Sequence, residues 1–230
     1  MNEDSFLVTE DLNINNLKII QKNNLYKFTS DAILLSRFAQ AKANDVVADF
    51  CSGSGIVGIH FYGLNPSIKS VTLFEMQKEL FDISMQSIKL NNLTNFNAVN
   101  CKLQDIGSEY NGKFSLVLCN PPYERKKTGI DIEKYNIAVC RHEIELTLSE
   151  IIAVAAKKLK FGGRIAMVNR ADRLADVISE MKKSNIEPKR LQFVQSKEDK
   201  EPYLLMIEGV LGGKSGIKVL NNIINKNFGG

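Results

Sequence analysis

The tetrad Asn120-Pro121-Pro122-Tyr123 combines groups that suit chemistry on a conjugated amino group. Such a nitrogen is planar, and its delocalised lone pair makes it a poor nucleophile. The Asn120 side-chain oxygen and the Pro121 carbonyl could both accept hydrogen bonds from one NH2 group, which localises its lone pair. The prolines stiffen the turn, and the Tyr123 ring offers a flat face for a planar substrate. The tetrad therefore indicates group transfer to an amide or ring NH2, and an ordinary Asn-Pro turn is the alternative.

A glycine-rich segment, residues 49–58, forms a second candidate site. It follows an apolar run and opens a helical pattern, and its glycines allow a tight turn and close approach of a ligand to the backbone. Glu75 lies 22 residues after Gly53, where a carboxylate can accept hydrogen bonds from both ribose hydroxyls of a nucleoside. Because Gly53, Gly55 and Gly58 also fit the dinucleotide fingerprint, both NAD and S-adenosylmethionine remain open as ligands.

Three features favour S-adenosylmethionine. Asp49 directly precedes the glycines, where it could hold a ligand's ammonium group directly or through water but would repel a pyrophosphate. Asp105 could accept a hydrogen bond from an adenine amino group, although a turn-forming Asp is the alternative. The tetrad at residues 120–123 has no evident role in hydride transfer.

The elements that must position these residues alternate between strands and helices. This alternation predicts an α/β fold with a doubly wound, mostly parallel sheet, helices on both faces and an antiparallel final strand. Both candidate sites then follow carboxyl ends of strands, where such sheets bind ligands. Strands are expected at residues 46–50, 70–74, 96–100, 114–119, 163–168, 190–195 and 203–210, and helices at 30–39, 56–62, 78–90, 146–159 and 173–183.

Three parts of the chain are expected. Residues 1–40 form an extension with a hairpin at 17–28, around Asn23-Asn24, and a helix capped by Ser30. Residues 41–211 form the core domain. Residues 212–230, which begin and end with paired glycines, are expected to form a poorly ordered tail.

Composition sets broad limits on function. The four cysteines show neither a CxxC pair nor metal-ligand spacing, which predicts a reducing compartment and no zinc site. The start of the chain lacks the pattern of a signal peptide, and no apolar run approaches the ~18 residues that span a membrane. A cytoplasmic protein is therefore expected.

The charge distribution is asymmetric. Residues 1–119 carry 10 basic and 12 acidic side chains, whereas residues 120–230 carry 20 and 14. The basic excess begins at the tetrad, so a polyanionic partner would fit that half of the chain. Ordinary solvated Lys and Arg side chains are the alternative interpretation.

With these residues identified, the chain resembles the Rossmann-like, seven-stranded S-adenosylmethionine-dependent methyltransferases. Residues 49–55 correspond to the glycine motif, Glu75 to the ribose acid, Asp105 to the adenine-side acid, and residues 120–123 to the amino-methylating tetrad. More closely, the chain is similar to the bacterial family that methylates N6 of adenine 37, beside the anticodon of a valine tRNA. Cys51 departs from the pattern, because many methyltransferases have Gly there. The closer likeness extends over segments 28–35, 138–143, 188–194 and 208–213.

The resemblance implies roles for individual residues. Asn120 and the Pro121 carbonyl would grip N6 of the target adenine, Tyr123 would stack on its ring, and no strongly basic residue would be needed. Ser30 and Asp31 would close the cofactor pocket, or serve only as a helix cap. The implied cofactor contacts are Ser30, Asp31, Asp49, Cys51, Gly53, Gly55, Glu75, Met76, Asp105 and Asn120.

The implied partner is tRNA, without a metal or a membrane, and a monomer is not distinguished from a homodimer. Candidate RNA contacts are Pro122, Tyr123, Lys126, Lys127, Lys134 and Arg141, with Arg170, Lys189 and Arg190 as weaker candidates for phosphate contacts.

Four other functions remain as alternatives. A protein glutamine amide is also a planar NH2 acceptor, but enzymes of that kind usually carry a sizeable helical domain before the core. DNA adenine is chemically equivalent, but no separate target-recognition segment is evident. An NAD-dependent oxidoreductase would leave Asn120 without a role. An RNA-binding module that has lost catalysis would not need the intact tetrad.

Overall fold

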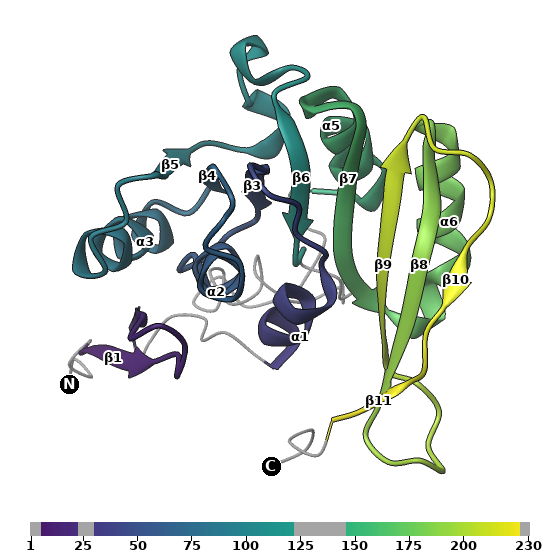
Figure 1. Ribbon diagram of the computed structural model, residues 1–230, viewed down its shortest axis with the longest axis horizontal. Helices are drawn as coiled ribbons and strands as arrows, with labels where there is room; N and C mark the ends of the chain where they lie inside the picture. The colour runs from purple at the N-terminus through teal and green to yellow at the C-terminus, as the bar shows by residue number, and fades with distance from the viewer. Residues whose placement is uncertain (1–5, 23–29, 122–145, 226–230) are drawn as a thin grey trace, which may run out of the picture.

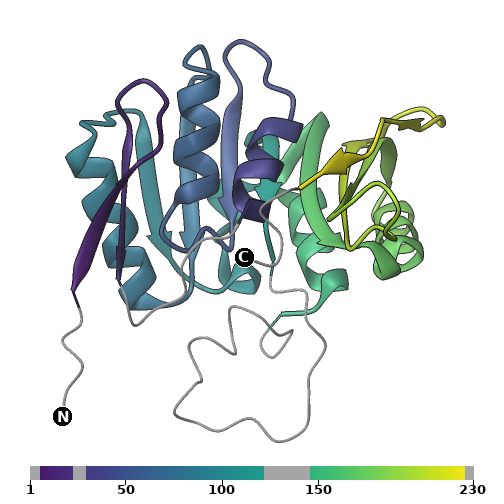
Figure 2. The same cartoon turned by 90° about the horizontal axis from the view of Figure 1, so that it is seen from below.

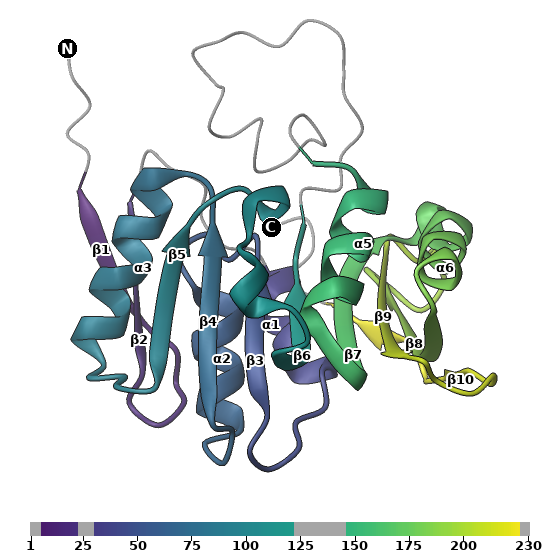
Figure 3. The same cartoon turned by 90° about the horizontal axis from the view of Figure 1, so that it is seen from above.

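The computed structural model describes residues 6–22, 30–121 and 146–225. In this part of the chain, nine strands form one sheet in the order β10-β8-β9-β7-β6-β3-β4-β5, with β11 also paired to β8 (Figures 1 and 3). The strands are β3 (Val46–Phe50), β4 (Ser70–Glu75), β5 (Phe96–Asn100), β6 (Phe114–Cys119), β7 (Leu159–Arg170), β8 (Ile186–Gln195), β9 (Leu204–Leu211), β10 (Lys218–Val219) and β11 (Ile223–Ile224).

The central strands β5, β4, β3, β6 and β7 are parallel, and β9 runs antiparallel to both β7 and β8. The predicted mostly parallel sheet with an antiparallel final strand is therefore confirmed. Every residue of β6 is buried, as expected for a parallel strand that is covered on both faces.

Helices cover both faces of the sheet. Figure 2 shows α1 (Ser30–Phe38) and α2 (Ile56–Leu64) on one face, and Figure 3 shows α5 (Leu148–Lys158) and α6 (Leu174–Lys183) on the other. The helix α3 (Lys78–Leu90) packs near β4 and β5. All five of these helices were expected from the sequence, with ends that differ by at most two residues.

Two hydrophobic cores follow from the alternation of side chains along the strands. Val47, Leu116 and Leu118 face α1 and α2, whereas Phe50 and Val117 face α5 and α6. The helices contribute apolar residues at helical spacing, and α5 begins with a capping box between Thr147 and Glu150.

A buried ion pair joins three strands at their amino-terminal ends. Arg164 of β7 donates to a carboxylate oxygen of Asp45 at 2.6 Å, and Ser115 of β6 donates to the other oxygen at 2.6 Å. The Arg164 guanidinium also donates to the Gln40 carbonyl at 3.0 Å. These contacts lie at the amino-terminal end of the sheet, away from both predicted sites.

The N-terminal hairpin differs from the expectation. Its strands are β1 (Leu7–Asp11) and β2 (Lys18–Lys22), so the partner of residues 18–22 precedes them in the sequence. The other predicted arm, residues 25–28, lies outside the described residues. The hairpin packs on α3, where the Ile20 amide donates to the Ser87 hydroxyl at 3.0 Å.

The expectation of a poorly ordered tail is wrong for residues 212–225. Within this segment β10 and β11 pair in parallel with β8, and the Leu220 amide donates to the Leu191 carbonyl at 2.8 Å. Residues 226–230 lie outside the described part. The segment therefore extends the edge of the sheet.

Candidate active site

Three loops meet at the carboxyl ends of the parallel strands. Phe50, the last residue of β3, pairs with Phe74 of β4 on one side and with Cys119 of β6 on the other. The glycine loop, the segment after Glu75 and the pair Asn120-Pro121 therefore leave the sheet at the same level. Figure 3 shows these strands side by side.

Asp49 is fully buried beneath the glycine loop. One carboxylate oxygen, Oδ2, accepts a hydrogen bond from the Gly58 amide at 2.8 Å. The other, Oδ1, is buried with no hydrogen-bond partner among the described residues. Burial, and to a smaller extent the nearby Glu75, raises the pKa of Asp49 from 3.8 to about 8. A buried carboxylate with a vacant acceptor favours a cationic donor as its partner.

Glu75 connects two of the loops. Its Oε2 accepts from the Gly53 amide at 2.8 Å, and its Oε1 accepts from the Gln77 amide at 2.8 Å. Burial raises the pKa of Glu75, and these main-chain hydrogen bonds oppose the rise. A carboxylate has about four lone-pair sites, so Glu75 retains capacity for a further donor, such as a ribose hydroxyl.

Asn100, which ends β5, is a supporting residue that the sequence interpretation missed. Its side-chain amide donates to the carbonyls of Glu75 and Met76 at 2.8 and 3.0 Å. These bonds hold the turn after β4, where the half-buried Met76 is a predicted cofactor contact. An Asn at a strand end is a common turn residue, so the sequence carried only a weak signal for this role.

The three glycines perform different tasks. Gly53 has a φ of +56° and nothing within 4 Å of the position that a Cβ would occupy, so a ligand can approach its backbone. Gly55 has a φ of +87°, and a Cβ there would lie 2.8 Å from Leu73 Cδ1. At Gly58 a Cβ would lie 2.8 Å from Leu73 Cδ2 and 3.2 Å from Asp49 Oδ2. Gly55 and Gly58 therefore allow α2 to pack closely on β4.

Gly58→Ala is expected to lower the free energy of unfolding by about 1–3 kcal/mol, because the added methyl overpacks the contact with Leu73. Urea denaturation followed by circular dichroism measures the change. Gly112→Ala is not a suitable control, because its φ of +65° adds strain. The exposed Gln86→Ala of α3 is a better one and should change stability by less than about 0.5 kcal/mol. An unchanged midpoint in Gly58→Ala would contradict the close contact.

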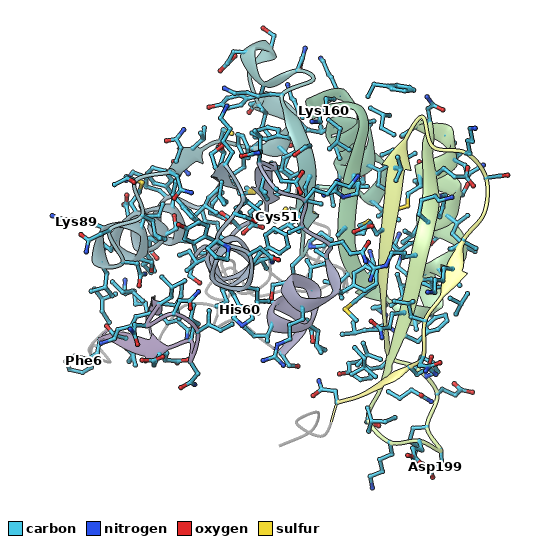
Figure 4. All side chains as sticks on the ribbon, in the orientation of Figure 1. Phe6, Cys51, His60, Lys89, Lys160 and Asp199 are labelled. Atoms are coloured by element: carbon cyan, nitrogen blue, oxygen red, sulfur yellow. The ribbon has the colours of Figure 1, made fainter. Side chains whose placement is uncertain are left out.

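Cys51 adopts the left-handed conformation, with a φ of +56°. That conformation costs a non-glycine residue roughly 1–2 kcal/mol, which accounts for the Gly that many methyltransferases have there. A hydrogen bond with the Cys119 thiol, together with burial, holds the pKa of the Cys51 thiol well above its usual range. The thiol is therefore neutral, and it contacts Cys119, the last residue of β6. Figure 4 labels Cys51.

Ser52 is a buried polar residue of the glycine loop that the sequence interpretation did not select. Its side chain is 3% exposed, and its Oγ has no hydrogen-bond partner among the described residues. Its amide donates to the Phe74 carbonyl at 3.1 Å, which ties the loop to β4. The hydroxyl is thus available to a ligand in the same loop.

Asn120 and Pro121 follow β6 at this edge. The Asn120 side-chain oxygen is buried and has no hydrogen-bond partner among the described residues, and Pro121 is buried. The edge therefore brings together the vacant acceptors of Asp49 and Asn120. The other predicted tetrad and RNA contacts, Pro122, Tyr123, Lys126, Lys127, Lys134 and Arg141, lie outside the described residues.

Asp105 ends a short 3-10 helix, η1 (Leu103–Asp105), that follows β5. Its side chain is exposed, and its amide donates to the Lys102 carbonyl at 3.0 Å. This position leaves the carboxylate at the carboxyl end of the sheet, on the side of β5. The adenine contact and the turn role both remain compatible with this placement.

Ser30 and Asp31 begin α1. The Ser30 hydroxyl lies 3.4 Å from Asp31 Oδ1 and accepts a hydrogen bond from the side-chain amide of Asn225 at 2.9 Å. Asp31 is buried, with 8% of its surface exposed. The sequence interpretation had no signal for a contact between residues so far apart in the chain.

The three weaker phosphate candidates make contacts within the protein. Arg190 donates to the Phe38 carbonyl at 3.1 Å, lies 4.6 Å from the centre of the Phe38 ring and pairs with Glu208 at 3.5 Å. Lys189 donates to the Lys214 carbonyl at 3.0 Å. Arg170, at the carboxyl end of β7, binds both carboxylate oxygens of Asp172 at 3.0–3.1 Å. Arg190 thus holds α1 on the sheet.

His60 is a structural residue that links α2 to α1. A hydrogen bond of 2.7 Å joins its Nδ1 to the Ser36 hydroxyl between α2 and α1. Burial lowers the pKa of His60 to about 4, so the imidazole is neutral at pH 7. Figure 4 labels His60 on α2.

The described residues contain no group of three or more His, Cys, Asp or Glu side chains placed to hold a metal. No helix in the same part of the chain has the length and apolar character needed to cross a membrane. The residues at the edge do fit S-adenosylmethionine. The vacant Asp49 oxygen suits an ammonium group, Glu75 suits a pair of hydroxyls, and the open face of Gly53 allows close approach.

Similar curated proteins are methyltransferases with different acceptors. The chain is 33% identical over 103 residues to a release factor glutamine methyltransferase of Mycoplasma mycoides, covering 45% of this chain and 34% of that protein. It is 31% identical over 97 residues to the rRNA N(6)-adenosine-methyltransferase METTL5 of Danio rerio, covering 42% and 46%. It is 22% identical over 180 residues to the tRNA1(Val) (adenine(37)-N6)-methyltransferase of Shewanella woodyi, covering 76% and 72%. The match spans less than half the length of the first two relatives.

Solved structures share the fold at low sequence identity. A predicted O-methyltransferase from Agrobacterium tumefaciens superposes with a TM-score of 0.68 at 16% identity, over 87% of this chain and 89% of that one. TYW2 of Pyrococcus horikoshii in complex with MeSAdo gives a TM-score of 0.63 at 14% identity, over 90% and 72%.

The sequence model of the methyltransferase small domain family matches residues 28–184. This range includes the glycine loop, Glu75 and the tetrad. The chain therefore belongs to the methyltransferase small domain family, and its cofactor is S-adenosylmethionine.

Proposed function

We propose that this protein methylates N6 of an adenine in a tRNA anticodon loop, at position 37 of a valine tRNA. The observation that carries the proposal is the buried Asn120 side-chain oxygen, which has no hydrogen-bond partner among the described residues. It lies at the end of β6, level with the Asp49 and Glu75 loops. An acceptor without a donor at this position is suited to a substrate NH2 group.

Different residues would bind the cofactor and activate the target amino group. Asn120 Oδ1 and the Pro121 carbonyl would accept the two N–H bonds of the target amino group, so that its lone pair is localised and directed outward. Asp49 would hold the ammonium group of the cofactor, and Glu75 its ribose hydroxyls. Bound S-adenosylmethionine supplies an electrophilic methyl group. The methylated nitrogen is acidic and would lose a proton to water, so catalysis rests on positioning and electrostatics.

An RNA loop suits this arrangement for two reasons. A paired, stacked adenine cannot present N6 to a buried acceptor, whereas a loop base is unpaired and costs less to extrude. The basic excess of residues 120–230, with 20 basic and 14 acidic side chains, favours a polyanionic partner. Relatives from Shewanella woodyi and Porphyromonas gingivalis are named tRNA1(Val) (adenine(37)-N6)-methyltransferases, which supports this choice of RNA.

Methylation of a protein glutamine is the second candidate function. The relative from Mycoplasma mycoides carries that name, and a glutamine amide presents the same planar NH2 group. We favour methylation of tRNA because the Shewanella woodyi match covers 72% of that protein, whereas the Mycoplasma mycoides match covers 34%.

The proposal is tested by incubating the protein with methyl-labelled S-adenosylmethionine and one of three acceptors. These are unmodified valine tRNA, a release factor and duplex DNA. Mass spectrometry of digests is expected to find labelled N6-methyladenosine in the tRNA at position 37. A valine tRNA with guanine at position 37 is the matched control and should remain unlabelled. Label confined to glutamine or DNA would contradict the tRNA proposal and leave the methyltransferase assignment intact.

A further inference from the structure

The segment after β9 returns to the carboxyl edge of the sheet. Its last strand, β11, pairs with the end of β8, where Ile224 is opposite Gln195 (Figure 1). The Asn225 amide then donates to the Gln195 carbonyl at 2.8 Å. The Asn225 side chain is 8% exposed, so the backbone pairing delivers a buried amide to this edge.

The Asn225 side chain joins three parts of the fold. Its Nδ2 donates to the Ser30 hydroxyl oxygen at 2.9 Å and to the Tyr203 phenol oxygen at 2.8 Å. An amide nitrogen has two N–H bonds, so both contacts can form together. Because the Ser30 oxygen accepts from Asn225, its own proton remains available to Asp31 Oδ1, 3.4 Å away.

Tyr203 belongs to a cluster with Ser30, Asp31 and Asn225, and main-chain hydrogen bonds hold it in place. Its amide donates to the Val194 carbonyl at 3.0 Å, and its carbonyl accepts from the Ala171 amide at 3.1 Å. Burial, together with the charge of Asp31, raises the pKa of Tyr203, while the hydrogen bond from Asn225 opposes the rise. Asp31 belongs to the same cluster, because its Oδ1 lies 3.4 Å from the Ser30 hydroxyl.

The cluster lies at the edge that holds the candidate active site. Met167 of β7 is level with Cys119 of β6, and Arg170 is paired with Leu204 of β9. Tyr203, which precedes Leu204, is therefore beyond the carboxyl end of β7, on the Asn120 side of the sheet. The other end of α1 lies near the opposite edge, because Arg164 donates to the Gln40 carbonyl at 3.0 Å.

The helices α1 and α2 run in the same direction. Each helix begins at the carboxyl edge of the sheet, α1 at Ser30 beside Asn225 and α2 directly after Gly55. A hydrogen bond of 2.7 Å joins Ser36 of α1 to His60 of α2. Ser30 therefore begins α1 at the edge where Gly55 begins α2. The first turn of α1 thus lies at the same edge of the sheet as the glycine loop, in contact with Asn225.

We infer that Asn225 is a positioning residue for cofactor binding. Its side chain joins the Ser30 hydroxyl to the Tyr203 phenol, so that the first turn of α1 is ordered before the cofactor arrives. The inference rests on the proposed methyltransferase function and on the cofactor contact that the resemblance implies for Ser30 and Asp31. Without Asn225 this turn must be ordered on binding, which weakens affinity through conformational entropy.

The test compares Asn225→Ala with Asn222→Ala. Asn222 belongs to the same segment, is exposed and donates to the Gln195 side chain at 2.9 Å, so it is a matched control. Isothermal titration with S-adenosylhomocysteine should give a dissociation constant about tenfold higher for Asn225→Ala and unchanged for Asn222→Ala. The KM for S-adenosylmethionine should rise similarly, while kcat at saturation should stay within about twofold. Each factor of ten corresponds to about 1.4 kcal/mol.

Thermal unfolding without ligand checks that both variants fold. Should Asn225→Ala fail to fold, Asn225→Asp keeps the shape but loses both donors, and the same loss of affinity is expected. A Ser30→Ala, Asn225→Ala double variant should bind S-adenosylhomocysteine no more weakly than the single variant with the lower affinity. Both changes break the same Ser30–Asn225 hydrogen bond. Equal affinity of Asn225→Ala and the wild type would overturn the inference. Binding is measured without tRNA, so weaker binding by Asn225→Ala supports the inference even where no tRNA is methylated.

Discussion

Asn120→Ala is expected to lower kcat by a factor on the order of 10²–10³. The dissociation constant for S-adenosylhomocysteine should change by less than about threefold, because the other implied cofactor contacts, Asp49 and Glu75 among them, remain. The substitution removes the buried oxygen that has no hydrogen-bond partner among the described residues. The target NH2 group would then remain planar and poorly nucleophilic. Single-turnover transfer of labelled methyl to tRNA measures the chemical step, and titration measures binding.

Asn120→Asp separates hydrogen-bond acceptance from simple space filling. A carboxylate also accepts hydrogen bonds from an NH2 group, so this variant should keep a measurable fraction of the transfer that Asn120→Ala loses. Equal activity of Asn120→Ala and the wild type would exclude the proposed role. Equal loss in both variants would show that the amide donors matter as well.

Cofactor binding is expected to strengthen as the pH rises from 6 to about 8. In the free protein the pKa of Asp49 is about 8, because the group is buried, so the carboxyl is largely protonated at pH 7. An ammonium group binds the ionised form, and binding must therefore release a proton. The dissociation constant for S-adenosylhomocysteine should fall by up to about tenfold per pH unit below pH 8 and level off above it.

Titration calorimetry in buffers of different ionisation enthalpy counts the released protons, and about one is expected at pH 6.5. Asp49→Asn should bind more weakly and lose the pH dependence. Glu75→Gln tests whether the other buried carboxyl of the site, rather than Asp49, releases the proton. Persistence of the full pH dependence in Asp49→Asn would assign the released proton to another group.

The same pKa shift affects the stability of the free protein. The folded-state pKa of Asp49 lies above the ordinary value of 3.8, so the folded protein holds the proton more tightly than the unfolded chain. The stabilising contribution of this group is present below pH 3.8 and is lost as the pH rises to about 8. Burial of the Asp49 carboxyl thus lowers the stability of the free protein as the pH rises, and it favours the binding of a cationic ligand.

The sequence predicted the central fold because its signals were local. Buried runs such as residues 114–119 and the glycine-rich turn after β3 indicate parallel strands without knowledge of their neighbours. Asp49, Glu75 and Asn120 could be placed at one edge for the same reason. Chain direction alone brings the carboxyl ends of parallel strands together.

The features that the sequence did not predict depend on contacts between distant residues. The strands β10 and β11 have two residues each and exist through hydrogen bonds to the edge of β8. The strand β7 begins four residues earlier than expected, because Leu159 pairs with Phe114 before a register shift at the paired glycines. Asn225 and Ser30 are joined only by the folded chain, and no local pattern indicates such a pair.

The Leu73 side chain restricts which residues can occupy positions 55 and 58 of the glycine loop. Its two methyl groups occupy the space that a Cβ at Gly55 or Gly58 would need. A smaller residue at position 73 would therefore create room for alanine at position 58. In a genetic selection for activity starting from Gly58→Ala, second-site revertants should concentrate at Leu73. The residues at positions 58 and 73 are then expected to change together among related sequences, although neither side chain needs to contact the ligand.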